Sequence, residues 1–166
     1  NNMKRPFFMS LLLAFSLSSF AQRIHQFAGT YEFHFPGTSL SHYIVLKQSG
    51  DQLTGRYLGC EAGNDTLYYA ASMKDLSIGA DGTISFKLKG FRLSPVPLQP
   101  GKEEYASEGQ QVIRDKIRDA AKPGKPLFLT GGYTFTGNIS KKNIRLRRTA
   151  DWYDNAADDM KFSKMK

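Results

Sequence analysis

Glu32 and His34 are the pair of side chains whose types and spacing come closest to acid–base chemistry. They stand two residues apart, so an extended strand would place both on one face, where a carboxylate beside an imidazole can transfer protons if the pair is enclosed. The opposite face of the same segment is aromatic, so we expect the pair to point into solvent. Because no further partner that a catalytic site requires is evident, the sequence predicts no catalytic residue and no enzyme activity.

Groups that could bind a metal are sparse. None of the three histidines has the spacing of a metal site. Four aspartates near the C-terminus could supply oxygen ligands to calcium, but their spacing is not that of an EF-hand loop, and a solvated acidic tail is the simpler interpretation. These aspartates are Asp151, Asp154, Asp158 and Asp159. We therefore expect no metal and no cofactor.

The single cysteine, Cys60, cannot form an internal disulfide, so hydrophobic packing must stabilise the fold. A free cysteine is most often a small buried apolar residue, and this is the expected state of Cys60. An exposed thiol that pairs with another molecule is the alternative.

Basic residues cluster in one predicted hairpin, the basic hairpin, which contains Lys141, Lys142, Arg145 and Arg147. The full chain carries a net charge of +8; residues 1–21 contribute two positive charges and no acid, so the remainder carries +6. Such an excess attracts an envelope protein or an anionic surface, and nucleic acid is the least expected partner if the chain is exported. Alternatively, the cluster is only the solvated outer face of an amphipathic strand.

Export is predicted from the first residues. Lys4 and Arg5 precede an apolar stretch, and Ser19-Phe20-Ala21 has the small residues of a signal peptidase site. The stretch is too short to span a membrane and no second one follows, so residues 1–21 are interpreted as a cleaved signal peptide. The remainder is expected to be a single domain, residues 22–166, in the periplasm or outside the cell, with no transmembrane anchor.

Short segments with alternating apolar and polar side chains cover most of residues 28–149, and Gly-containing turns separate them, as is typical of strands. The sequence predicts about eight strands, at 28–35, 42–48, 52–59, 67–78, 83–89, 126–130, 133–139 and 144–148. Residues 92–101 contain three prolines and are expected to form a loop. Residues 103–121 have the apolar spacing of a helix, and residues 150–166 are expected to form a charged tail.

Strands of this length joined by tight turns favour a single antiparallel β-barrel, with one helix inserted late in the chain. Its predicted inward face is aromatic and almost free of charge. Eight strands leave an interior that side chains can fill or that holds one small ligand, and we expect a mostly filled barrel with at most a small apolar pocket at one end. The residues expected to contact a ligand are Tyr31, Phe33, Phe35, Leu46, Tyr57, Phe86, Tyr133 and Phe135.

The segment Ala28-Gly29-Thr30-Tyr31 resembles the Gly-x-Trp opening of the lipocalin and wider calycin superfamily, with tyrosine in place of tryptophan. In that superfamily the aromatic residue seals the closed end of an eight-stranded barrel, under a basic residue from the last strand. The resemblance implies that Arg145 or Arg147, in the last predicted strand, is the basic partner. The predicted helix precedes the final strands, whereas lipocalins carry theirs after the eighth, which leaves strand order and ligand class open.

Two expectations about function follow. The first is an exported, non-enzymatic, lipocalin-like barrel that binds a small apolar or amphipathic molecule such as a lipid. The alternative is an envelope protein-interaction module, or an inhibitor of an exported enzyme, that acts through the basic hairpin and the proline-rich loop.

Overall fold

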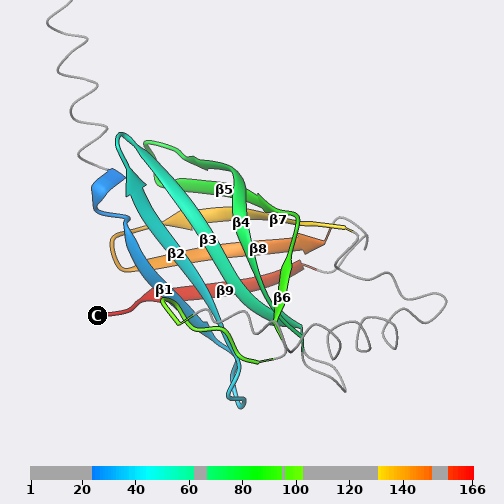
Figure 1. Ribbon diagram of the computed structural model, residues 1–166. Coiled ribbons are helices and arrows are strands. Elements are labelled where there is room, and N and C mark those ends of the chain that lie inside the picture. The colour runs from blue at the N-terminus through cyan, green and yellow to red at the C-terminus, as the bar shows by residue number, and fades with distance from the viewer. Residues whose placement is uncertain (1–23, 62–66, 95, 103–130, 151–156) are drawn as a thin grey trace, which may run out of the picture.

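The computed structural model describes residues 24–61, 67–94, 96–102, 131–150 and 157–166 (Figure 1). The predicted signal peptide, the helix predicted at 103–121 and the strand predicted at 126–130 lie outside these residues. The described strands are β1 (Gly29–His34), β2 (Ser41–Ser49), β3 (Gln52–Glu61), β4 (Leu67–Ile78), β5 (Thr83–Leu88), β6 (Arg92–Ser94), β7 (Tyr133–Ile139), β8 (Asn143–Ala150) and β9 (Ala157–Lys164).

Eight of these strands form a closed antiparallel barrel, as the sequence predicts. The order around the barrel is β1, β2, β3, β4, β5, β7, β8 and β9, and β9 pairs with β1 to complete the circle. The short strand β6 continues the path of β5 beyond Gly90 and pairs with the other half of β4. Each barrel strand therefore pairs with its neighbours along the chain, so the topology is a simple meander.

Side-chain alternation explains why these segments form strands around one core. In β2, Ile44 and Leu46 are buried, whereas Val45 and Lys47 face outward. A turn at Gly50, whose φ of 60° favours glycine, then returns the chain as β3. The same alternation in the other strands collects their apolar side chains inside a single enclosed core, in which each fully buried large residue contributes about 1.5–3 kcal/mol.

The closed end of the barrel is built from the first residues of β1 and the last residue of β9. The Tyr31 hydroxyl donates a hydrogen bond of 2.9 Å to the Phe27 carbonyl, and burial raises the pKa of Tyr31 to about 12. The ammonium of Lys164 lies 5.5 Å from the centre of the Tyr31 ring and donates a hydrogen bond of 3.1 Å to the Gln26 carbonyl. Gly29, with a φ of 141°, leaves room for this lysine, because a Cβ there would lie 2.5 Å from Lys164 Cε.

This arrangement corrects the expectation that Arg145 or Arg147 covers Tyr31. Both arginines lie on β8 and are exposed on the outer face of the barrel. The basic residue over Tyr31 is Lys164, because the last strand of the barrel is β9 and not β8.

The C-terminal segment, expected to be a charged tail, contains a strand. Residues 157–164 form β9, which pairs with β8 over seven residue pairs and with β1. Met160 and Phe162 point into the core and are buried. Met160 and Phe162 alternate with the polar residues Asp159, Lys161 and Ser163, as in a strand. The many charged residues around them make this alternation hard to recognise in the sequence.

The proline-rich segment lies against the outer wall of the barrel. Its first three residues are β6, and Leu98 in its second half lies over β3 and β4. Leu98 is buried against Leu58 and Ala70, which point outward from these two strands. Hydrophobic packing therefore exists on both sides of this part of the wall.

Candidate ligand-binding site

The residues predicted to contact a ligand come together in the core. Tyr31, Leu46, Tyr57, Phe86 and Phe135 are at most 1% exposed. Their rings pack on one another: the Phe86 and Phe135 centroids are 4.7 Å apart, and the Tyr57 and Phe135 centroids 5.1 Å apart. These side chains occupy the interior themselves and stabilise the barrel.

The other three predicted ligand-contacting residues lie nearer the end of the barrel opposite Lys164. Phe33 and Phe35 are half-buried and pack edge to face, while Tyr133 is buried. The guanidinium of Arg148 lies 4.8 Å from the centre of the Tyr133 ring and forms an ion pair with Asp158.

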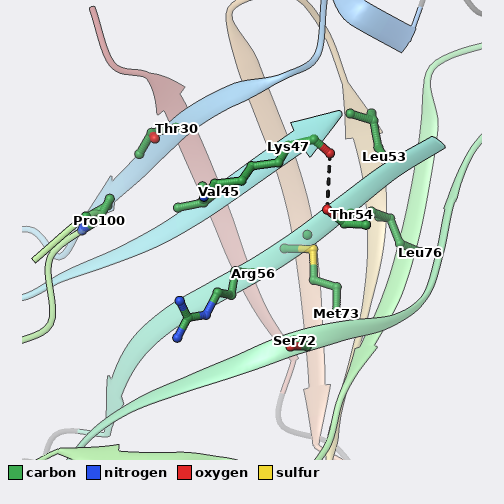
Figure 2. A pocket seen from close by; sticks show the side chains of 12 residues that line it. Thr30, Val45, Lys47, Leu53, Thr54, Arg56, Ser72, Met73, Leu76 and Pro100 are labelled. Atoms are coloured by element: carbon green, nitrogen blue, oxygen red, sulfur yellow. Dashed lines mark hydrogen bonds between the residues drawn. The ribbon is translucent and has the colours of Figure 1, made fainter. Parts of the chain in front are cut away.

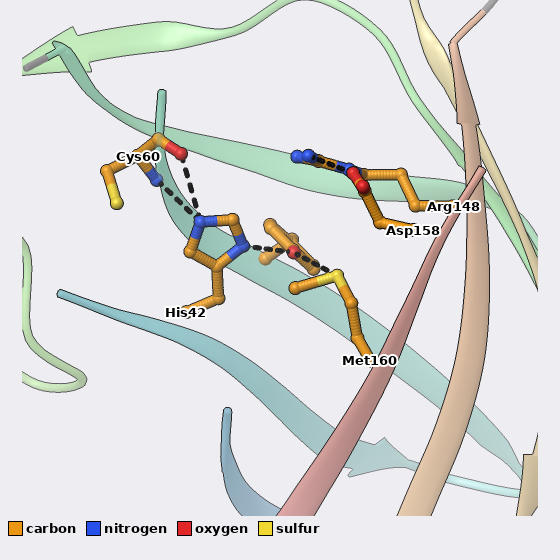
Figure 3. Close-up of polar contacts among 6 residues, drawn as sticks. His42, Cys60, Arg148, Asp158 and Met160 are labelled. Carbon is orange, nitrogen blue, oxygen red and sulfur yellow. Dashed lines mark hydrogen bonds and ion pairs between the residues drawn. The ribbon is translucent and has the colours of Figure 1, made fainter. Parts of the chain in front are cut away.

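A buried histidine, His42, packs against the rings of Phe33 and Phe35, and Figure 3 shows its polar contacts. His42 is fully buried, and its Nδ1 lies 2.5 Å from the Tyr57 hydroxyl. Its Nε2 lies 3.0 Å from the Cys60 carbonyl oxygen and 3.1 Å from the Cys60 amide nitrogen. Either neutral tautomer is satisfied. In one, Nε2–H donates to the Cys60 carbonyl while the Tyr57 hydroxyl donates to Nδ1; in the other, the Cys60 amide donates to Nε2 while Nδ1–H donates to the Tyr57 hydroxyl oxygen.

Burial and, to a lesser extent, the positive charge of Arg148 lower the pKa of His42 to about 3, against smaller opposing effects of the Cys60 hydrogen bond and Asp158. The imidazole is therefore neutral at physiological pH. Cys60 itself is buried with a free thiol, as expected from the sequence. This polar cluster satisfies its own hydrogen bonds within the core.

The barrel wall is interrupted between β3 and β4. Their ladder runs from Glu61 and Leu67 to Arg56 and Ser72, and no further pair joins the two strands. The cause lies in β4, where Asp75 has a φ of 53° and the register with β5 shifts by one residue. Such a bulge bends the strand and increases its local twist, which separates β4 from β3.

The interruption forms a groove of about 940 Å³, the β3–β4 groove (Figure 2). Its apolar lining includes Leu53, Met73 and Leu76, and its cations are Lys47 and Arg56. Gly55 lies at its centre, where a Cβ would meet Met73 Sδ at 2.2 Å, so the thioether fills the place of the missing side chain. The remaining lining residues are Thr30, Val45, Thr54, Ser72, Pro100 and Gly101.

A smaller hollow of about 380 Å³ extends the groove toward the closed end of the barrel. Leu53 and Leu76 line both hollows, and Ile24 and Ile78 add apolar surface to the second. The groove and the smaller hollow together form a continuous depression that has cationic side chains in the groove and aliphatic side chains in the smaller hollow.

The basic hairpin is exposed on the opposite wall. Lys141 and Lys142 lie in the β7–β8 turn, and Arg145 and Arg147 point outward from β8. Arg145 stands directly across from Lys161 of β9. The described part of the chain offers no ion pair to Arg145, Arg147 or Lys161.

The acid–base pair considered from the sequence is not assembled. His34 is exposed, and its Nδ1 lies 3.0 Å from the Ser41 hydroxyl; Glu32 lies across from Tyr43. Asp158 is paired with Arg148, and Asp151 and Asp154 lie outside the described residues. Within the described ranges, no three His, Cys, Asp or Glu side chains are grouped to hold a metal ion.

The sequence contained signals for features that were not predicted. His42 shares the alternation of Ile44 and Leu46, which places it inside. Consecutive polar residues Lys74 and Asp75 shift the apolar alternation from Met73 to Leu76, which indicates a bulge.

Comparison with known proteins gives no relative: no family profile, curated protein or solved structure matches the chain. Across the described residues, no helix has both the length and the apolar character needed to cross a membrane.

Proposed function

We propose that this chain is an exported, non-enzymatic barrel that binds a small amphipathic molecule in the β3–β4 groove. The observation that carries the proposal is the groove itself, which combines cations and aliphatic side chains in about 940 Å³. Small-molecule sites usually have volumes of about 300–1,000 Å³ and combine apolar surface with a few polar groups. The site is on the wall of the barrel, because aromatic side chains occupy the interior.

Charge and apolar surface are arranged for a ligand with two different ends. Lys47 is exposed, and its ammonium makes no ion pair or side-chain hydrogen bond with the described residues. Leu53 and Leu76 are half-buried and already pack against the core, so an alkyl chain placed on them would bury surface that water now contacts. An anionic head beside the cations of the groove and an alkyl chain along the leucines would satisfy both ends.

The proposal is tested by filling the groove from outside. Thr54 is exposed and lines the groove, so Thr54→Trp adds bulk there without entering the core. We expect isothermal titration to show binding of dodecanoate to the unaltered protein and an affinity about tenfold or more lower for this variant.

Thr136→Trp is the matched control, because Thr136 is an exposed outward residue on β7, across the barrel. It is expected to bind dodecanoate as the unaltered protein does, with both variants melting at similar temperatures. If the unaltered protein does not bind dodecanoate or another dodecyl amphiphile, or if both tryptophan variants bind equally well, the proposal is wrong.

One observation favours the alternative function, binding of an anionic partner through the basic hairpin. Arg145 and Lys161 lie directly opposite each other, and like charges in this position destabilise a sheet unless an anion lies between them. The double variant Arg145→Gln/Arg147→Gln should then elute from a sulfated matrix at clearly lower salt than the Lys87→Gln/Lys89→Gln variant. Equal elution would remove this candidate.

A further inference from the structure

A second hollow on the outer wall adjoins the β3–β4 groove. It measures about 650 Å³ and shares Arg56 and Ser72 with the groove. Its floor consists of small residues, Ala70, Ala71, Ser72 and Gly90. Because the side chains of the floor are small, space remains between the longer side chains around it.

Those longer side chains are all cations, and we call the site the cationic hollow. Arg56, Lys74, Lys89 and Arg92 line it, and none of the lining residues that the structure describes is acidic. They come from β3, from β4, from the end of β5 and from β6. The pairing of β6 with β4 brings Arg92 directly across from Ala70, so all four parts of the chain bring positive charge to the same place.

The two lysines of this hollow differ from other basic residues nearby. Lys87 is paired with Asp75, with 3.5 Å between Nζ and Oδ2. Lys74 and Lys89 are exposed, and neither has an ion pair or side-chain hydrogen bond in the part of the chain that the structure describes. The charge of each lysine is therefore not paired with a described acid.

We infer that the cationic hollow binds the head group of the amphipathic ligand and that this head group is a phosphate. Lys74 and Lys89, which have no ion pair in the described part of the chain, add two positive charges beside the guanidinium groups of Arg56 and Arg92, and this favours a group that carries more than one negative charge. A phosphate monoester carries about 1.5 to 2 negative charges at neutral pH and offers three acceptor oxygens, whereas a carboxylate carries one charge. Arginine guanidinium groups also match phosphate oxygens with paired N–H donors.

The inference deepens the proposed function and depends on it, because the alkyl chain of the same ligand would occupy the groove. Arg56 and Ser72 line both hollows, so a head in one and a chain in the other is a continuous path. The ligand class is thus an alkyl phosphate, with the phosphate over β4 and the chain directed toward Leu53 and Leu76.

The test compares dodecyl phosphate, dodecanoate, dodecyl maltoside and inorganic phosphate by isothermal titration, below the critical micelle concentrations and with the fold monitored by circular dichroism. We expect dodecyl phosphate to bind about tenfold or more tightly than dodecyl maltoside, with dodecanoate between them. Inorganic phosphate should bind at least about a hundredfold more weakly than dodecyl phosphate, because it lacks the alkyl chain.

Lys74→Gln/Lys89→Gln should remove the preference for dodecyl phosphate and leave the affinity for dodecyl maltoside unchanged. Arg145→Gln/Arg147→Gln changes the net charge equally on the opposite wall and should retain the preference. Loss of preference in both variants would show a general effect of net charge and overturn the inference.

The remaining outcomes separate the two proposals. If dodecyl maltoside and dodecyl phosphate bind equally in all variants, the phosphate inference is wrong while the proposed function stands. If inorganic phosphate binds as tightly as dodecyl phosphate, the hollow is a site for free phosphate and the inference is again wrong. If no dodecyl compound binds, the proposed function fails, and the inference fails with it.

Discussion

At the residue scale, His42 shows how a polar side chain can belong to an aromatic core. Its ring packs edge to face on Phe35 and Tyr57, at centroid distances of 4.9 and 5.5 Å. Both ring nitrogens have hydrogen-bond partners, which offsets the cost of removing the imidazole from water. The neutral ring is therefore compatible with the core, whereas a protonated ring is not.

This difference makes stability depend on pH. The folded pKa is about 3 and the unfolded value about 6.5, so the unfolded chain binds more protons between these values. Stability is present above the unfolded pKa and is lost as the pH falls through this window. Relative to His42→Gln, the unaltered protein should lose about 2–3 kcal/mol of unfolding free energy between about pH 7 and about pH 4.5, measured by urea unfolding. A constant difference between the two proteins would contradict the assignment of His42.

Lys164 covers the closed end of the barrel, through its contact with Tyr31 and its hydrogen bond to the Gln26 carbonyl. Lys164→Ala should lower the free energy of unfolding by about 1–3 kcal/mol, because it removes a charged hydrogen bond and a cation–π contact. Thermal melting measures this effect. Lys166→Ala, which removes an exposed lysine two residues later, should melt like the unaltered protein; equal losses would show that only net charge matters.

Residue-level prediction from sequence was strongest where alternation decides burial. The inward positions of Ile44, Phe86 and Phe135 follow directly from a period of two, and all three are buried. The basic partner of Tyr31 was assigned wrongly. The resemblance places this partner on the last strand of the barrel, and that strand, β9, was not recognised because its apolar residues stand among charged ones.

At the scale of elements, the bulge in β4 determines the candidate site. Asp75 is one extra residue on the strand, and the ladder with β3 ends just before it. The existence of the described strands other than β6 and β9 could be predicted from composition and alternation. Strand pairing could not, because whether β3 and β4 stay paired along their length depends on backbone twist, which no single residue type reports.

Deletion of Asp75 tests this role. The β4–β5 register would become uniform, and β4 could pair with β3 beyond Arg56 and Ser72, so the groove should narrow. We expect affinity for dodecanoate to fall about tenfold or more while the melting temperature is retained. Asp75→Asn keeps a residue type that tolerates positive φ and should bind normally. Normal binding of dodecanoate by the deletion variant would show that ligand binding does not depend on the bulge.

At the scale of the whole molecule, the barrel has a packed core, and its outer surface differs from one side to the other: one side carries the β3–β4 groove and the opposite side the basic hairpin. The eight-strand antiparallel closure was predictable, because many short alternating segments with tight turns have few other ways to bury one face each. The location of the candidate site was not predictable, since it lies where outward side chains from separate strands meet. The basic hairpin on β8 lies opposite the β3–β4 groove, and Figure 1 shows β3 in front of β8.

The central claim is that the ligand binds outside the filled barrel, between β3 and β4. It is tested most directly by paramagnetic broadening of backbone amide NMR signals with dodecyl phosphate that carries a nitroxide at the end of its chain. We predict that the signals of Thr54, Gly55 and Leu76 broaden most strongly, while those of Phe33 and Tyr133 remain sharp. Strong broadening of Phe33 and Tyr133, with Thr54 and Leu76 unaffected, would place the ligand in the barrel mouth and contradict the account.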